Sequence, residues 1–337
     1  MALVTGATGL LGSHLCFTLL EKGEEVYALK RSTSNISFVE KTFELYSDNS
    51  KEYFDKIKWI EGDILDFYFI DELVSKHKEV YHTAAFVSFH KEDHSQIMDI
   101  NIQGTVNIAT ACQRYNSRLI YASSIAALGR GLGDEPTTEN DIRESSFESS
   151  VYSKSKFLAE QEIWRAIAEG LNAAMVNPAV ILGPGDWSKS SAQLFQTIEN
   201  GLKFYTNGSN GYVDVRDVST IMFRLMKSEI KGERFILSAE NISYKDLFTV
   251  IATALSVSPP KILANKLVSE LSWRIISAWS FISGSTPLIT KETAKSANTY
   301  YKYSSEKIIK ELDYRFIPIE DSIRNTANAY LKGAFKK

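Results

Sequence analysis

Short apolar runs alternate with longer segments of helical periodicity over the first half of the chain. The runs expected to form buried strands cover residues 2–4, 26–29, 58–60, 80–82, 118–122 and 172–176. Between them, mostly apolar positions recur at helical spacing, first at Leu10, Leu11, His14, Leu15, Thr18 and Leu19. This alternation predicts an α/β fold with a doubly wound parallel sheet, the Rossmann type.

Three of the segments between the strands have a character of their own. Residues 36–56 carry mixed charge and predict a helical insertion. Residues 97–115 predict one long helix, and residues 129–150 predict a polar loop.

The pattern changes after Asp186. The elements expected there are a helix over 188–200, a turn at 207–211, a strand over 234–237 and further helices. We therefore expect two parts. The first covers residues 1–186, with returning elements near 203–237, and the second, residues 187–337, is mainly a cap over the sheet.

The turn after the first strand holds three glycines. Gly6 allows a tight turn, Gly9 lets a pyrophosphate approach the backbone, and Gly12 lets helix and strand pack closely. The N-terminus of the following helix offers N–H groups and a partial positive charge to phosphates. Because the turn lies between a predicted strand and a predicted helix, it predicts a dinucleotide site in residues 1–186.

Charge and composition exclude several classes of partner. The 337 residues are 44% hydrophobic with a net charge of −3, which gives no reason to expect nucleic acid or an anionic membrane as partner. The two cysteines fall in predicted helices, where we expect them to be small buried apolar residues, as is typical of a protein in a reducing compartment. The first strand begins at the second residue, so we expect no signal peptide. Residues 262–282 carry charges at four-residue spacing and predict an amphipathic helix rather than a membrane span. We expect a cytoplasmic protein without a metal site.

The end of the second strand indicates which dinucleotide is bound. An NAD-specific fold places an acidic residue there to bind the ribose hydroxyls, whereas this chain has Lys30 and Arg31. Two cations fit a 2′-phosphate and favour NADP, with NAD possible; the alternative is an ordinary solvated basic pair. Asp63 is expected to bind the adenine amino group or to cap the helix that starts near Asp66.

Candidate catalytic groups follow the fifth strand. Tyr152 and Lys156 lie four residues apart on a predicted helix and share one face. A tyrosine titrates near pH ~10, and a nearby ammonium lowers that value toward a useful acid–base range. Ser124, at the end of the strand, can hydrogen-bond the same substrate oxygen. His82 is expected to be a hydrogen-bonded structural residue.

These residues resemble the extended short-chain dehydrogenase/reductase family, which includes NAD-dependent epimerases and dehydratases. The motifs in the family's order and spacing are Gly6/Gly9/Gly12, Asp63-Ile64, Ala84-Ala85, Asn101, Ser123-Ser124, Tyr152/Lys156, Asn177-Pro178 and Gly183-Pro184-Gly185. Residues 27–31 are similar to the dihydroflavonol-reductase-like branch, in which an arginine at this place binds the NADP phosphate. Residues 82–85 and 212–218 are similar to that branch and to 3β-hydroxysteroid dehydrogenases.

The resemblance implies an NAD(P)-dependent oxidoreductase that acts on CH–OH or C=O groups. It implies Tyr152 as proton donor or acceptor, Lys156 on the ribose and lowering the tyrosine's pKa, and Ser124 polarising the substrate oxygen. The residues expected to contact the cofactor are Gly6, Thr8, Gly9, Leu10, Leu11, Gly12, Lys30, Arg31, Asp63, Ile64, Thr83, Ala84, Ala85, Asn101, Tyr152, Lys156, Asn177, Pro178 and Ile181.

Differences between this chain and the family's motifs exclude some of the family's reactions. Its sugar-nucleotide dehydratases carry an Asp-Glu pair where this chain has Ile125-Ala126, so dehydration is not expected. We predict NADPH-dependent reduction of a carbonyl on a mostly apolar small molecule. A nucleotide-sugar epimerase and a non-catalytic dinucleotide-binding module are the alternatives. A homodimer through residues 95–114 and 152–169 is possible in this family.

Overall fold

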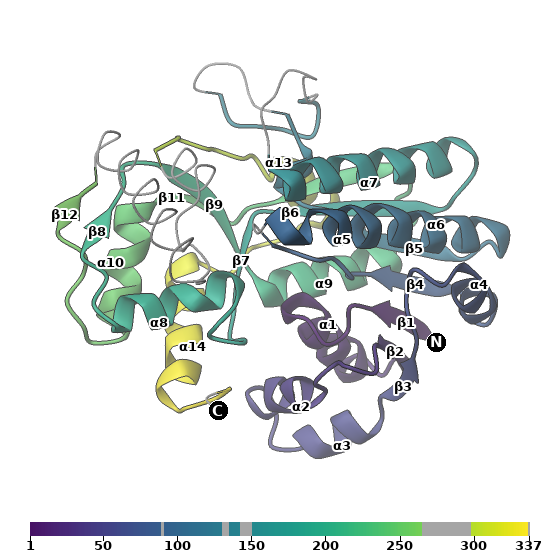
Figure 1. Ribbon diagram of the computed structural model, residues 1–337, viewed down its shortest axis with the longest axis horizontal. Helices are drawn as coiled ribbons and strands as arrows, with labels where there is room; N and C mark the ends of the chain where they lie inside the picture. The colour runs from purple at the N-terminus through teal and green to yellow at the C-terminus, as the bar shows by residue number, and fades with distance from the viewer. Residues whose placement is uncertain (89–90, 130–134, 142–149, 265–297, 336–337) are drawn as a thin grey trace.

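Seven parallel strands form the central sheet of the protein. The structure is a computed structural model that describes residues 1–88, 91–129, 135–141, 150–264 and 298–335. The strands are β1 (Ala2–Thr5), β2 (Val26–Lys30), β3 (Lys58–Glu61), β4 (Glu79–His82), β5 (Arg118–Ala122), β6 (Ala173–Pro178) and β10 (Glu233–Leu237). Their order in the sheet is β10-β6-β5-β4-β1-β2-β3 (Figure 1). The predicted fold class, a doubly wound α/β sheet, is confirmed.

Helices cover both faces of this sheet. The helices on one face are α1 (Leu10–Glu21), α2 (Ser37–Glu44), α3 (Ser50–Asp55) and α9 (Val215–Met226); those on the other are α4 (Phe67–Ser75), α6 (Gly104–Arg114) and α7 (Val151–Ala168). Successive side chains of a strand point to opposite faces. Val4 of β1 therefore lies in the core under α1 and α9, and Leu3 lies in the core under α4, α6 and α7. Burial on both faces explains why these strands are continuous apolar runs.

The direction of winding reverses beside β1, which pairs with β2 on one side and with β4 on the other. In sheets of this kind, ligands bind outside the carboxyl ends of the strands at the reversal. The fold therefore places the carboxyl ends of β1, β4, β5 and β6 side by side at one edge of the sheet.

The long helix predicted over 97–115 is wrong in detail. The chain forms α5 (His94–Met98), a π-helical turn η2 (Asp99–Gln103) and then α6. Residue periodicity cannot reveal a π-turn, because it changes the count by only one residue. The turn carries Asn101, whose amide bonds to the backbone of Phe86 and to Ser155.

The predicted turn at 207–211 is also corrected, because Ser209–Asp214 forms strand β9. Gly211 lies within this strand, and a Cβ there would lie 2.5 Å from Ser238 Oγ. The glycine therefore allows close packing and does not make a turn. The helix predicted over 188–200 is shorter, with a 3-10 turn η4 (Ser190–Ala192) followed by α8 (Gln193–Glu199).

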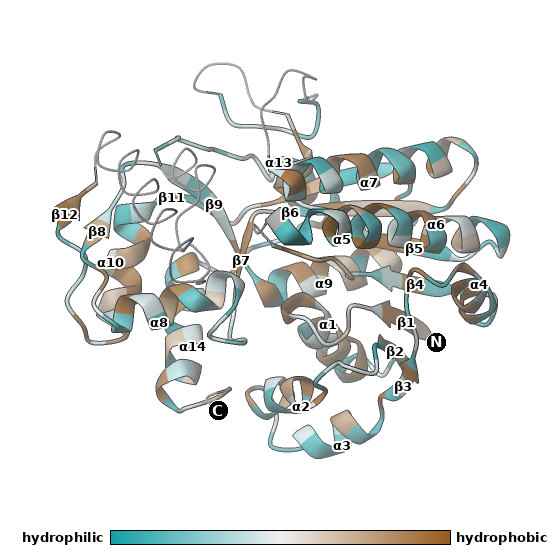
Figure 2. Cartoon of the chain, viewed as in Figure 1, coloured by the Kyte–Doolittle hydropathy of each residue, from teal (hydrophilic) through white to brown (hydrophobic). Residues whose placement is uncertain are grey.

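Most of the remaining elements surround a core of their own, in the part of the chain expected to form the cap. They are β7 (Val180–Leu182), β8 (Phe204–Tyr205), β11 (Glu240–Ser243), β12 (Ile262–Leu263), α10 (Tyr244–Ala254) and α14 (Ile319–Leu331). Trp187, Phe195, Tyr212 and Leu247 are buried together there, and Figure 2 shows the apolar stripes of α8 and α10. In contrast, α13 (Glu306–Leu312) packs on β10, and its Ile308 belongs to the core under α1 and α9. Two further 3-10 turns, η1 (Lys91–Asp93) and η3 (Ile125–Ala127), complete the described elements.

Two predicted segments lie largely outside the described residues. The amphipathic helix expected over 262–282 begins where the structure has β12, and its residues 265–282 are not described. Of the expected polar loop, residues 135–141 are described. Among the helices that the structure describes, none is both long and apolar enough to cross a membrane.

Candidate active site

The glycine-rich turn lies between the ends of β1 and β4. Gly6 has φ +70°, and a Cβ on it would lie 2.5 Å from the backbone nitrogen of Ala84. A Cβ on Gly12 would overlap the carbonyl oxygen of Gly6. The tight turn and the close helix–strand packing expected from the sequence are therefore present. A Cβ on the exposed Gly9 would meet only Gly6 O, at 3.3 Å.

The described residues around this turn fit a dinucleotide. Gly9 is the N-cap of α1, and neither a side-chain cap nor an acidic first-turn residue is present there, so Leu10 and Leu11 begin a helix end open to phosphate. Thr8 lies in the turn and is partly exposed. Thr83 Oγ1 donates to Thr5 O at 2.7 Å, and the small Ala84 and Ala85 follow it.

Ser124 and Tyr152 meet at the carboxyl end of β5. Ser124 caps η3, where its Oγ accepts a hydrogen bond from Ala126 N at 3.1 Å. The same side chain lies beside the hydroxyl of Tyr152, the second residue of α7. Burial raises the pKa of Tyr152, and the neighbouring Ser124 hydroxyl lowers it in part. The phenol is therefore protonated at neutral pH and can act as an acid.

Lys156 lies one helical turn further along α7 and is only 1% exposed. Its ammonium donates to Tyr121 Oη at 2.9 Å and to the carbonyl of Ala122 at 2.8 Å. Burial lowers the pKa of Lys156 to about 7, while the charge of Glu160 raises it. The recorded bonds of the ammonium go to β5, so the expected effect of Lys156 on the Tyr152 pKa stays a prediction.

Asn177 closes the site at the end of β6. Its Nδ2 donates to Ser124 O at 3.0 Å and to Glu160 Oε2 at 2.7 Å. Its Oδ1 is buried and has no partner among the described residues. A buried acceptor without a donor fits the carboxamide of a nicotinamide. Pro178 follows it, and Ile181 of β7 lies partly buried nearby in the chain.

Glu160 forms hydrogen bonds that link the ends of β5 and β6 to the edge strand β10. Its carboxylate is 1% exposed and accepts hydrogen bonds from Ser123 Oγ at 2.5 Å and from Arg234 at 2.7 Å. Arg234, in β10, also donates to the carbonyl of Glu139 at 2.9 Å. A buried ion pair thus connects the described part of the polar loop with Asn177.

The two cations after β2 are in different situations. Lys30 Nζ donates to Glu61 Oε2 at 2.9 Å, because β2 and β3 place these residues side by side. Arg31 is exposed, and its guanidinium makes no ion pair with any described residue. The contact of either residue with a 2′-phosphate stays a prediction, and Arg31 is the one of the two without an ion pair among the described residues.

Asn101, Asp63 and Ile64 are also expected to contact the cofactor, and each contacts other residues of the protein. All three hydrogen bonds of the Asn101 amide go to Phe86 and Ser155. Asp63 Oδ1 accepts from Leu65 N at 2.9 Å, and the helix cap is Asp66. Ile64 is buried against Gly104, where a Cβ would lie 2.5 Å from its Cδ1. The adenine contact of Asp63 stays a prediction.

Sequence reasoning missed Tyr121, Glu160 and Arg234. A weak signal exists for two of them. Tyr121 is a phenol inside a strand buried on both faces, which requires a partner for its hydroxyl. Glu160 lies four residues after Lys156, on the same helix face. Nothing in the sequence indicates that Arg234 pairs with Glu160.

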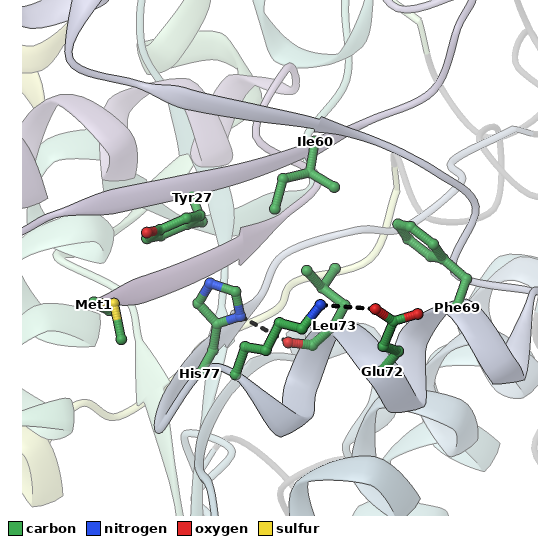
Figure 3. Close-up of a pocket in the computed structure, with 8 residues that line it drawn as sticks. Met1, Tyr27, Ile60, Phe69, Glu72, Leu73 and His77 are labelled. Carbon is green, nitrogen blue, oxygen red and sulfur yellow. Dashed lines mark hydrogen bonds and ion pairs between the residues drawn. The ribbon is translucent and has the colours of Figure 1, made fainter.

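A hollow of about 350 Å³ lies elsewhere, beside the amino end of β1 and against α4 (Figure 3). Its polar side chains have partners within the protein, and the Tyr27 hydroxyl bonds to Glu25 and Lys58, which lie outside the lining. Glu72 accepts from Lys76 at 2.7 Å, and the His77 ring bonds to Leu73 O at 2.7 Å. It is away from the carboxyl ends of the strands and forms no part of the site.

The fold and the strand-end site define a dinucleotide-dependent oxidoreductase. The chain belongs to the NAD dependent epimerase/dehydratase family, whose pattern matches residues 2–237. It is an enzyme of the extended short-chain dehydrogenase/reductase type, as predicted.

Similar proteins include two curated relatives and one solved structure. Sterol demethylase protein B of Methylococcus capsulatus is 28% identical over 71% of this chain and 70% of that protein. A putative dihydroflavonol 4-reductase of Synechocystis is 26% identical over 99% of this chain and 95% of that protein. The crystal structure of gox2253 has a TM-score of 0.83 at 28% identity, and covers 100% of this chain and 99% of that one.

Proposed function

We propose that the protein reduces a carbonyl group on a mostly apolar small molecule with NADPH. The observation that carries the proposal is the placement of Ser124 beside Tyr152 at the end of β5, next to the buried oxygen of Asn177 that has no partner among the described residues. The names of the relatives, a sterol-processing protein and a dihydroflavonol reductase, support a polycyclic, largely apolar substrate.

Each residue has a defined part in this reaction. When bound, the reduced nicotinamide supplies the hydride that adds to the carbonyl carbon. Tyr152 donates its phenolic proton to the carbonyl oxygen, and Ser124 donates a hydrogen bond to that oxygen as negative charge develops on it. Lys156 holds the nicotinamide ribose, and its positive charge favours the phenolate left on Tyr152. Asn177 Oδ1 would accept a hydrogen bond from the carboxamide of the nicotinamide and so help to orient the ring.

A substrate screen tests the proposal. NADPH oxidation is followed with aldehydes, ketones and flavonoid- or steroid-like compounds, beside an assay for UDP-sugar epimerisation. We expect stoichiometric NADPH oxidation with a compound of the apolar group. Epimerisation without net NADPH consumption would contradict the proposal and assign the chain to the epimerases.

The cofactor preference is expected to depend on Arg31. Arg31→Ala removes the open cation after β2 and is expected to weaken NADPH binding about 10- to 100-fold, the effect of one charge-assisted hydrogen bond. NADH binding is expected to change little. Lys30→Ala is the matched control, with a smaller effect because Glu61 holds Lys30. Fluorescence titration of both cofactors measures this, and equal affinity of the wild type for NADH would contradict it.

We also propose a homodimer in which α6 and α7, neighbours on one face of the sheet, meet their copies. Light scattering is expected to give the dimer mass. A monomer mass over a wide concentration range would contradict this arrangement.

A further inference from the structure

A buried network of polar side chains extends from β1 to α7, next to the carboxyl ends of the strands. Thr5, His82, Thr105, Tyr121 and Lys156 follow one another in it, and each is at most 1% exposed. The hydrogen bonds are Thr5 Oγ1 with His82 Nδ1 at 2.6 Å, His82 Nε2 with Thr105 Oγ1 at 3.1 Å, and Lys156 Nζ with Tyr121 Oη at 2.9 Å. Thr105 also lies close enough to Tyr121 to lower the pKa of its phenol.

The contacts fix the direction of each hydrogen bond. Thr105 Oγ1 donates to the carbonyl of Asn101 at 2.6 Å, so it accepts from its other partners. His82 therefore carries its proton on Nε2 and accepts from Thr5 at Nδ1. Burial, and then the charge of Lys156, lower the pKa of His82 to about 3, so the ring stays neutral. This confirms His82 as a hydrogen-bonded structural residue.

Within this network, Tyr121 is the residue whose side chain contacts Lys156. Its hydroxyl accepts a hydrogen bond from the ammonium at 2.9 Å, and the neighbouring Thr105 lowers the pKa of the phenol. The ammonium has three N–H groups, and the described residues supply acceptors for two of them, Tyr121 Oη and Ala122 O. The third remains for a ligand.

The charged and titratable groups around Lys156 come from three elements. Tyr121 belongs to β5 and stacks on His82 of β4, with ring centroids 5.4 Å apart. Glu160 and Tyr152 are on α7 itself. Of these, Glu160 is the anion that favours the ammonium, and Tyr121 is the neutral side chain that binds it directly.

We propose that Tyr121 is a positioning residue, which holds the ammonium of Lys156 against β5 so that its remaining N–H points to the ribose of the cofactor. The proposal rests on the proposed role of Lys156 in binding that ribose. Through Thr105 and His82, the surroundings of Tyr121 are linked to Thr5, at the start of the glycine-rich turn.

The test replaces Tyr121 with phenylalanine, which keeps the ring and removes the acceptor. The ammonium loses a hydrogen bond, so its protonated form is less favoured and it titrates at lower pH. We expect a downward shift of about one pH unit, measured without cofactor by NMR of ¹³Cε-labelled lysine. We also expect NADPH to bind about tenfold more weakly in a direct titration.

Tyr81→Phe is the matched control. Tyr81 lies in β4 next to this region and is fully buried, and its hydroxyl has no partner among the described residues. Removing that hydroxyl is expected to leave both the Lys156 titration and NADPH binding unchanged. Thr105→Val provides a second variant if Tyr121→Phe does not fold, and a smaller shift in the same direction is expected because Tyr121 loses the polar side chain beside its hydroxyl.

An unchanged Lys156 titration in both Tyr121→Phe and Thr105→Val would overturn the proposal. An equal shift in Tyr81→Phe would also overturn it, since the effect would then be general to the core. The NMR titration needs no substrate. If the wild type reduces no carbonyl and Lys156 still shifts in Tyr121→Phe, the proposed reaction fails while the positioning role stands.

Discussion

Tyr152→Phe is expected to lower kcat roughly 10²- to 10⁴-fold, the usual contribution of a positioned general acid. The substitution removes only the hydroxyl beside Ser124, so the packing of the ring is kept. NADPH affinity is therefore expected to stay within about twofold of the wild type. Steady-state kinetics with the substrate found by screening, together with a binding titration, measures both quantities.

The control for this prediction is Tyr53→Phe. Tyr53 is in α3 and packs against Phe17 on the far side of α1, with ring centroids 5.6 Å apart. It is a tyrosine outside the strand-end site, and its variant is expected to have wild-type kcat. Wild-type turnover in Tyr152→Phe would reject Tyr152 as the acid.

Gly9→Ala is expected to weaken NADPH binding about 100-fold while the protein stays folded. The added methyl group meets the protein only at Gly6 O, at 3.3 Å, and otherwise occupies the space in front of the α1 N-terminus. A pyrophosphate that cannot reach the N–H groups loses one or two charge-assisted hydrogen bonds, each ~1.5–3 kcal/mol. Titration calorimetry measures the affinity, and a thermal melt is expected to show Tm within a few degrees of wild type.

Gly12→Ala separates this effect from loss of structure. Its Cβ would overlap the backbone of Gly6, which cannot move without opening the turn. We therefore expect a large fall in Tm together with loss of binding. Wild-type NADPH affinity in a folded Gly9→Ala protein would contradict the placement of the phosphates.

The parts of the fold and site that the sequence predicted depend on local chemistry. The roles of Gly6 and Gly12 can be predicted from sequence, because a tight turn and close packing of a helix on a strand tolerate few residues other than glycine. The strands were found as apolar runs because both faces of the sheet are covered. Ser124 could be placed at the ligand-binding edge because the carboxyl ends of parallel strands share that edge. Tyr152, on α7, was joined to it by the order and spacing of the family's motifs.

The parts that sequence reasoning missed depend on pairings between distant residues. Lys30 is held by Glu61, and that contact follows only from the register of β2 and β3. Arg234 reaches Glu160 across a separation of 74 residues. The π-turn that carries Asn101 leaves the apolar spacing almost unchanged, so no periodicity could reveal it.

The return of the chain to the sheet determines when the fold can be completed during synthesis. β6 ends at Pro178, but its second neighbour, β10, begins at Glu233, and α9, which covers α1, lies between them in sequence. A nascent chain that ends after β6 therefore exposes an open strand edge and the apolar surface of α1. The dinucleotide-binding part is completed only after much of the cap has been made, so the two are expected to fold together rather than one after the other.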